Sequence, residues 1–282
     1  RTRPSSTAWA WVYAMLYFLQ IGWPAWAGTA AGAMFFLFTR RLAESADATS
    51  IYYIGVAAFL ACVAILTFGR RIERTLELMN WVLVATILGT FLVLAVVFVP
   101  GRTWAAAVTG LAGYDLTRGT FDFFPADTDL FLLGALAAYS GAGGVVNITL
   151  SNWARDRGYG MGERAGYIAS AIGGQKVMLA HNGFMFEGDP EGMRRWHGWW
   201  RIVRADQWGV FFVGAILGMI LPAMIYVTFL PPGTNIEGLG ISAALAQAIS
   251  GTSGVLLGGV IAFLGAWILF KTQLDALEGM VR

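Results

Sequence analysis

The stretch Tyr139-Ser140-Gly141-Ala142-Gly143-Gly144-Val145-Val146-Asn147 lies inside an apolar run that begins near Leu130. Three of four consecutive residues are glycine there, and each glycine costs a helix about 1 kcal/mol relative to alanine. Within lipid, broken helix is tolerated where its backbone groups are buried in protein or line a cavity. Because polar side chains flank the glycines, we interpret the stretch as a helix broken around a binding site. The alternative is that the glycines serve close helix packing.

Composition places the chain among polytopic membrane proteins, because hydrophobic residues make up 57% and charged residues 13% of its 282 residues. Apolar stretches of about 20 residues have the length of a membrane-spanning helix. We therefore predict an all-α protein in which residues 1–282 form a single transmembrane domain. The predicted spans are 7–39, 51–69, 78–99, 129–153, 208–230 and 240–271. Pro24 and Pro222 are expected to kink the first and the fifth of these helices.

Lysine and arginine fall unevenly on the two faces that alternating spans create. One face carries fifteen of them and the other four, which is a positive-inside pattern. The larger set is Arg1, Arg3, Arg70, Arg71, Arg74, Arg155, Arg157, Arg164, Lys176, Arg194, Arg195, Arg201, Arg204, Lys271 and Arg282. The smaller set is Arg40, Arg41, Arg102 and Arg118. We expect both ends of this chain to be cytoplasmic, in the inner membrane of a bacterium.

Two loops follow from this arrangement. The outer loop 100–128 carries Asp115, Asp122 and Asp127, which either raise the local concentration of cations or are ordinary solvated side chains. The cytoplasmic segment 155–207 contains a helix start at Asp189-Pro190-Glu191, followed by alternating tryptophans and arginines. That alternation predicts an interfacial amphipathic helix that leads into the span at Trp208.

Ionisable residues are scarce within the predicted spans, which argues against a proton relay carried by these helices. The exception is Lys271, Asp275 and Glu278, spaced i, i+4 and i+7 on one helical face. They form either an ion pair on a helix leaving the membrane or the mouth of a cytoplasmic exit path. Cys62 is expected to pack in a core, and a single cysteine excludes a disulfide framework. Nucleophile, zinc-protease and phosphate-loop motifs are missing, so we expect no enzyme, no cofactor and no nucleic-acid partner.

The order of these features resembles the third to eighth transmembrane helices of the Nramp family of divalent metal transporters. The similarity rests on Gly28-Thr29-Ala30, on Gly69-Arg70-Arg71-Ile72-Glu73-Arg74, on the span ending at Pro100, on the broken helix at Gly141–Asn147, and on Leu277-Glu278-Gly279-Met280. It looks closest to the divergent Nramp-related branch. The resemblance implies a leucine-transporter-like inverted-repeat fold, present here in part, with metal bound between the broken first and sixth helices. The first-helix motif, Asp-Pro-Gly-x-Asn, lies outside this chain, which we expect to be a fragment of a longer protein.

Two departures from the family pattern bear on the transported ion. The sixth-helix motif Ala-x-x-Met-Pro-His is replaced by Gly141–Asn147, so the methionine and histidine are absent. A thioether favours soft metals, whereas carbonyl and amide oxygens favour hard ions such as Mg²⁺. The family's third-helix acids are also missing from Gly22–Gly28. Both losses point to a hard or hydrated cation with weak or absent proton coupling, or else to transport of another small solute.

The resulting hypothesis is transport of divalent cations, Mg²⁺-like or Mn²⁺/Fe²⁺, across a lipid bilayer. The expected metal ligands are the carbonyls of Ala142, Gly143 and Gly144 with the side chain of Asn147. Tyr139, Ser140 and Thr149 are expected to contact these ligands and not the metal itself. Asp275 and Glu278 would line the exit path. One alternative is a sodium-coupled carrier of a small organic solute. The other is a membrane scaffold or sensor that does not transport and works through the segment 189–207.

Overall fold

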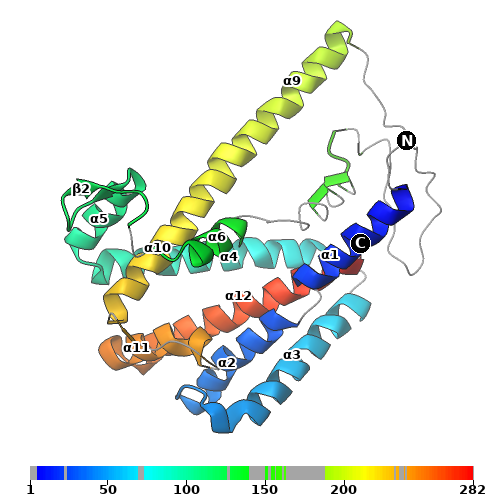
Figure 1. The fold of residues 1–282 in the computed structure, drawn as a ribbon. Helices are drawn as coiled ribbons and strands as arrows, with labels where there is room; N and C mark the ends of the chain where they lie inside the picture. Colours follow the sequence, from blue (N-terminus) through cyan, green and yellow to red (C-terminus); the bar gives the residue numbers. More distant parts are fainter. Residues whose placement is uncertain are drawn as a thin grey trace. The chain divides into compact units, whose positions relative to one another are not determined.

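The structure is a computed structural model of an all-α membrane protein with one small β-hairpin (Figure 1). It describes residues 5–21, 24–68, 73–125, 128–139, 150–151, 154–155, 157–160, 162, 188–231, 233–234, 238 and 240–281. Within these residues, four helices are long and apolar enough to cross a membrane: Ser45–Thr67, Asn80–Phe98, Pro190–Phe229 and Val255–Gly279.

The first predicted span, 7–39, contains two helices. Helix α1 covers Ser6–Ile21 and helix α2 covers Ala25–Thr39, with Pro24 at the N-cap of α2. Proline begins a helix well because its missing N–H removes a donor that has no partner in the first turn, and it interrupts one that arrives from the N-terminal side. The expected kink at Pro24 is therefore a boundary between two helices. Helix α2 ends at Arg40, which adopts the left-handed conformation with φ 60°.

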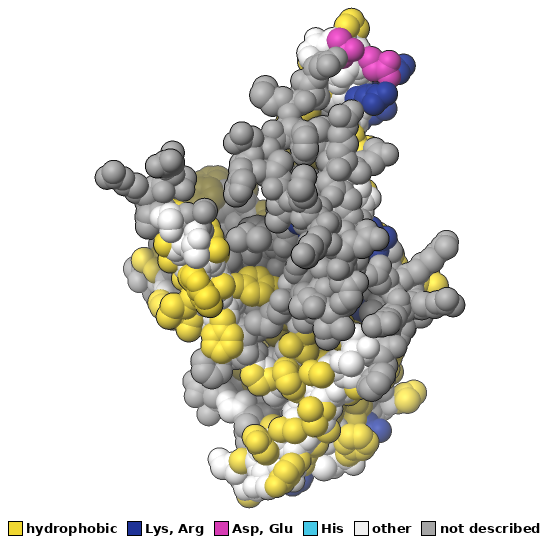
Figure 2. Space-filling model, turned by 90° about the vertical axis from the view of Figure 1, so that its right-hand side faces the viewer, with side chains coloured by type: hydrophobic (Ala, Val, Ile, Leu, Met, Phe, Trp, Pro, Cys, Tyr) yellow, Lys and Arg dark blue, Asp and Glu magenta, His cyan; other side chains and the backbone are white. Residues whose placement is uncertain are grey.

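Helices α3 (Ala48–Phe68) and α4 (Glu73–Phe98) follow, close to the predicted ranges 51–69 and 78–99. A short 3₁₀ turn, η1 (Ser45–Asp47), leads into α3, and Arg41 forms an ion pair with Asp47 there at 2.6 Å. Many large apolar side chains of α3 and α4 are exposed, among them Tyr52, Tyr53, Val93, Val96 and Val97. Figure 2 shows such hydrophobic side chains spread over the described surface. Exposed apolar faces of this extent are the surfaces that helices of membrane proteins present to lipid.

A compact elbow, residues 101–124, follows the end of α4. Helix α5 (Gly101–Leu111) starts directly after Pro100, and the two-residue strands β1 (Tyr114–Asp115) and β2 (Thr120–Phe121) pair antiparallel behind it. The loop 100–128 was predicted only as a polar outer loop, and this helix and hairpin are additions to the expected architecture.

The predicted fourth span is described in part, as helix α6 (Leu130–Tyr139). The predicted fifth span belongs to a longer helical stretch of 40 residues, Pro190–Phe229. It consists of α9 (Pro190–Ala205), a π-helical segment η2 (Asp206–Phe212) and α10 (Val213–Phe229), with Pro222 inside α10. The amphipathic helix expected before Trp208 is therefore continuous with the membrane helix.

The predicted sixth span, 240–271, is divided as well. A 3₁₀ turn η3 (Ile241–Ala243) precedes α11 (Ala244–Ser253), and α12 (Val255–Val281) begins after Gly254. Gly254 has φ 100° and ψ 153°, a backbone conformation open almost exclusively to glycine, and this ends α11.

Two compact units make up the chain. The first consists of Arg1–Gly22, Thr128–Leu217 and Glu278–Arg282, and the second of Trp23–Asp127 and Gly218–Leu277. The second unit has its own hydrophobic core, to which α2, α4, α10, α11 and α12 all contribute buried side chains. Its members include Phe36, Leu94, Leu221, Ile225 and Ile249. This core fixes the positions of α2 and α12, which carry the polar contacts described next.

Candidate functional site

Polar side chains gather within the second unit on helix α12, in an otherwise apolar sequence. Lys271 and Gln273 are the buried polar or charged residues in the described part of the chain. Asp275 lies one turn beyond Lys271 on the same helix. Buried polar groups in membrane helices mark functional sites more often than packing positions, because each must be satisfied inside the protein. The contacts of this cluster therefore define the candidate site.

Gln273 provides a hydrogen-bond acceptor for a backbone N–H at the start of α2. Its side-chain Oε1 accepts a hydrogen bond from the backbone N–H of Ala27 at 3.1 Å, across 246 residues of sequence. The first N–H groups of any helix lack partners within the helix, and Pro24 at the N-cap offers no side-chain acceptor. Both Gln273 and Ala27 are only 1% exposed, so water is excluded from this contact. The start of α2 is thus stabilised from α12.

Lys271 and Asp275 form the ion pair that their i,i+4 spacing predicts. The two side chains differ in environment, since that of Lys271 is 11% exposed and that of Asp275 is 49% exposed. A buried ammonium group requires a partner, whereas a half-exposed carboxylate also retains contact with solvent. The carboxylate of Asp275 therefore lies on the accessible side of the cluster. Glu278 lies farther along α12 and is half-buried.

Cys62 packs against the same part of α12. It is completely buried in α3, and its thiol contacts the backbone carbonyl of Phe270 at 3.8 Å. This is the core-packing role expected for a lone cysteine. The contact places Cys62 of α3 next to the residue that precedes Lys271.

The metal ligands expected from the sequence lie outside the described residues. These are Ala142, Gly143, Gly144 and Asn147, together with Ser140 and Thr149. Tyr139 is the last residue of α6. In the described part of the chain, no group of three or more histidine, cysteine, aspartate or glutamate side chains is placed to hold a metal ion. His197 is exposed, and its Nδ1 lies 2.7 Å from the carbonyl oxygen of Met193 one turn earlier in α9.

A second interruption occurs between α11 and α12. The hydroxyl groups of Ser242, Ser250 and Ser253 are buried near it, and no hydrogen-bond partner for them lies within the described residues. Gly258 lets the two helices approach, since a Cβ atom at that position would lie 1.8 Å from Ser250 Oγ and 2.5 Å from the carbonyl oxygen of Ala246. The α11–α12 junction is therefore closely packed and polar.

Sequence reasoning missed both Gln273 and this junction. An amide side chain within an apolar helix was a visible signal for Gln273, but its partner, a backbone N–H on a helix far away in sequence, has no signature in the side chains. The signal for the junction was the pair Ser253-Gly254, which lies inside a range predicted as one span.

Comparison with known proteins adds no relative: no protein-family model, no curated protein and no solved structure matches this chain.

Proposed function

We propose that this chain forms part of a transporter of divalent cations, with the partial leucine-transporter-like fold of the Nramp-related branch. The observation that carries the proposal is the start of α2 after Pro24, where the buried N–H of Ala27 donates to Gln273 of α12. Transporters of this architecture bind their substrates where membrane helices are discontinuous, and the broken ends supply oriented backbone groups.

The ion pair on α12 supports the same proposal. Asp275 is a half-exposed carboxylate next to a buried ammonium, and hard divalent cations take oxygen ligands. We assign Asp275 to the exit path, where it holds a departing cation transiently while Lys271 limits the affinity of that contact. The cation itself would be bound by the carbonyls of Ala142, Gly143 and Gly144 and by Asn147, as expected from the sequence.

Uptake of Mg²⁺ and Mn²⁺ into dye-loaded proteoliposomes tests this function with the full-length protein. We expect Mg²⁺ to enter, and the substitution Asp275→Asn to lower the initial rate several-fold. Glu191→Gln is the matched control, because Glu191 also pairs with a cation at i,i+4, Arg195 at 2.7 Å, but on the exposed surface of α9. Gly144→Met should lower Mg²⁺ uptake if the broken helix sets ion selectivity.

Other outcomes point to the alternatives. Uptake of Mn²⁺ alone would show that loss of the family's thioether does not set selectivity. Failure to move either ion under any gradient would contradict the proposal. The remaining candidates would then be a sodium-coupled carrier of an organic solute, or a membrane scaffold acting through α9. An uptake rate that is insensitive to Asp275→Asn would exclude this residue from the path while leaving transport intact.

A further inference from the structure

We propose that the elbow, residues 101–124, is a lipid anchor that inserts aromatic side chains into the membrane leaflet next to the C-terminal end of α4. This inference is independent of the transported substrate. It rests on the fixed geometry of the elbow, on its exposed aromatic side chains and on its covalent position directly after a membrane helix.

The elbow is held rigidly to α4. Trp104 of α5 donates its indole N–H to the carbonyl oxygen of Ala95 in α4, at 3.3 Å. Trp104 and Ala107 also pack on the hydrophobic core of the second unit. Val108 and Leu111 follow Trp104 and Ala107 on the same helical face, at i+4 and i+7 from Trp104, and are 64% and 60% exposed.

The hairpin beyond α5 has a defined shape as well. Gly113 adopts φ 75°, and the ring of Phe123 packs over it so closely that a Cβ atom there would lie 2.5 Å from the ring. The N–H of Asp122 donates to the carbonyl of Gly113 at 2.8 Å, and the rings of Tyr114 and Phe121 meet edge to face at 5.0 Å. A fixed conformation means that insertion of these side chains requires little further ordering of the chain.

The acids of this loop are engaged in turns. Asp115 Oδ1 accepts hydrogen bonds from the N–H groups of Thr117 and Arg118, and these bonds lower the pKa of its carboxyl. Asp122 accepts one from the N–H of Phe124 at 3.0 Å. Arg102 and Arg118 balance the two acids, so the elbow has no net charge. These contacts favour a structural role for the acids over attraction of cations, and they favour an apolar partner over a charged one.

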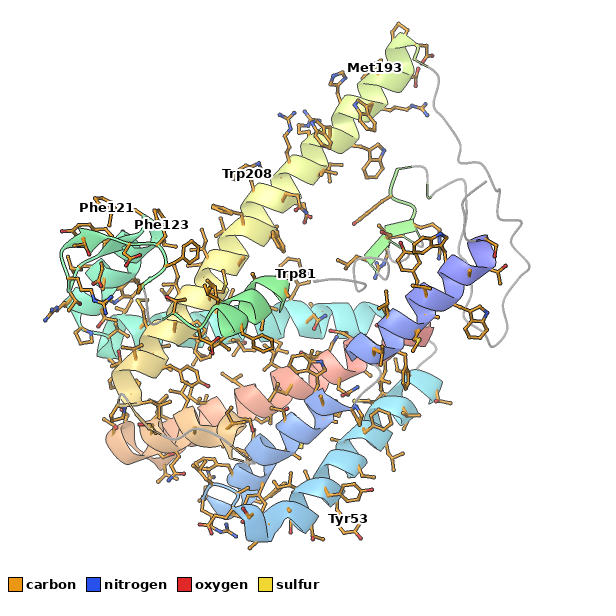
Figure 3. All side chains as sticks on the ribbon, in the orientation of Figure 1. Tyr53, Trp81, Phe121, Phe123, Met193 and Trp208 are labelled. Carbon is orange, nitrogen blue, oxygen red and sulfur yellow. The ribbon has the colours of Figure 1, made fainter. Side chains whose placement is uncertain are left out.

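Three phenylalanines at the end of the hairpin are exposed, next to the polar turn at residues 117–120. Phe121 is 76% exposed, Phe123 is 68% exposed and Phe124 is 64% exposed, and Figure 3 labels the first two on the hairpin. Only Val99 and Pro100 separate α5 from the last residue of α4, so the hairpin lies beside the lipid–water boundary. Val93, Val96 and Val97 near the end of α4 are exposed apolar side chains as well. Amphipathic elements with such residues bind where headgroups meet acyl chains.

Single cysteines carrying an environment-sensitive nitrobenzoxadiazole probe test the proposal in the full chain. Phe121→Cys and Phe124→Cys place the probe at the proposed anchor, and Thr117→Cys places it at the exposed turn. Cys62 is completely buried, and the unsubstituted chain reports its background labelling. The labelled proteins are reconstituted into phosphatidylcholine vesicles containing lipid with a nitroxide high on the acyl chain.

We expect the nitroxide lipid to quench the probes at 121 and 124, and their emission to shift to the blue. The probe at 117 should instead be quenched by aqueous iodide. The Phe121→Cys substitution removes the ring contact with Tyr114. Phe124→Cys probes the same surface with that contact intact, so it serves as the control for local loss of structure.

Quenching of all three probes by iodide would overturn the proposal, because the elbow would then lie in water. Shielding of positions 121 and 124 from both quenchers would also overturn it, because protein would then cover them. If dilution of the protein in lipid removes that shielding, the cover is a second copy of the chain. If the shielding persists, the cover is another segment of the same chain.

Discussion

Backbone N–H groups at two helix boundaries, the start of α2 and the junction at Gly254, find their hydrogen-bond acceptors in different ways. At the start of α2, the N–H of Ala27 finds its acceptor in Gln273, 246 residues away on α12. At Gly254 the contacts are local, because its own N–H donates to the carbonyl of Ser250 and that of Gly258 donates to the carbonyl of Gly254. The first boundary depends on a tertiary hydrogen bond, and the second on the backbone conformation of one glycine and on close packing.

This difference predicts different sensitivities to mutation. Changes in side-chain volume should damage the α11–α12 junction, whereas loss of a hydrogen-bond acceptor should damage the start of α2. Reversible unfolding in mixed micelles, with the free energy of unfolding compared between variants, separates the two cases.

The largest effect is expected for Gly258→Ala, a loss of about 3 kcal/mol. The added methyl group would overlap with Ser250 Oγ and the carbonyl oxygen of Ala246, and α11 and α12 would have to separate. Gly251→Ala is the control on α11, because a Cβ atom there meets nothing within 4 Å. That control should be neutral or stabilising by up to about 1 kcal/mol, since alanine favours helix more than glycine. Equal effects of the two substitutions would refute close packing at this junction.

A smaller loss, about 2 kcal/mol, is expected for Gln273→Leu. Leucine retains most of the packing volume but leaves the N–H of Ala27 buried without an acceptor. The comparison variant is Gln247→Leu, at an exposed position of α11, which should change the free energy of unfolding by less than about 0.5 kcal/mol. If both variants unfold alike, the start of α2 does not depend on α12.

The smallest effect is expected for Ser250→Ala, a change within about 0.5 kcal/mol of zero. Its hydroxyl is buried without a partner among the described residues, so its removal leaves no other group unsatisfied. A loss above about 1 kcal/mol, measured in the same unfolding assay, would show that this hydroxyl is bonded and that the second interruption also relies on side-chain contacts.

The sequence was sufficient for features that depend on local patterns. Apolar length predicted α3 and α4 to within about five residues at their starts and one at their ends, and i,i+4 spacing predicted the pair Lys271–Asp275. Pro24 was predicted to kink the helix of the first span, whereas in the structure it is the N-cap at which α2 begins. Hydropathy alone did not divide the range 240–271 at Gly254, because small residues on both sides are compatible with one helix.

Features that depend on contacts distant in sequence were not predictable. The acceptor for Ala27 became apparent only once α12 lay beside α2. By contrast, the local signal at Asp189-Pro190-Glu191 predicted the start of α9 correctly, and the helix leads into the fifth span as expected. The candidate ligands Ala142, Gly143, Gly144 and Asn147 remain predictions.

The 40-residue helix from Pro190 to Phe229 has a consequence for vertical movement in the bilayer. The part after Asp206 carries no charged side chain through Phe229, whereas Arg201, Arg204 and Asp206 directly precede it. Sliding the helix inward by one turn would bring charged groups into the hydrocarbon, at roughly 3 kcal/mol each. The charge boundary therefore opposes inward sliding of this helix along the membrane normal, whereas a tilt or a rotation can keep the charged groups outside the hydrocarbon.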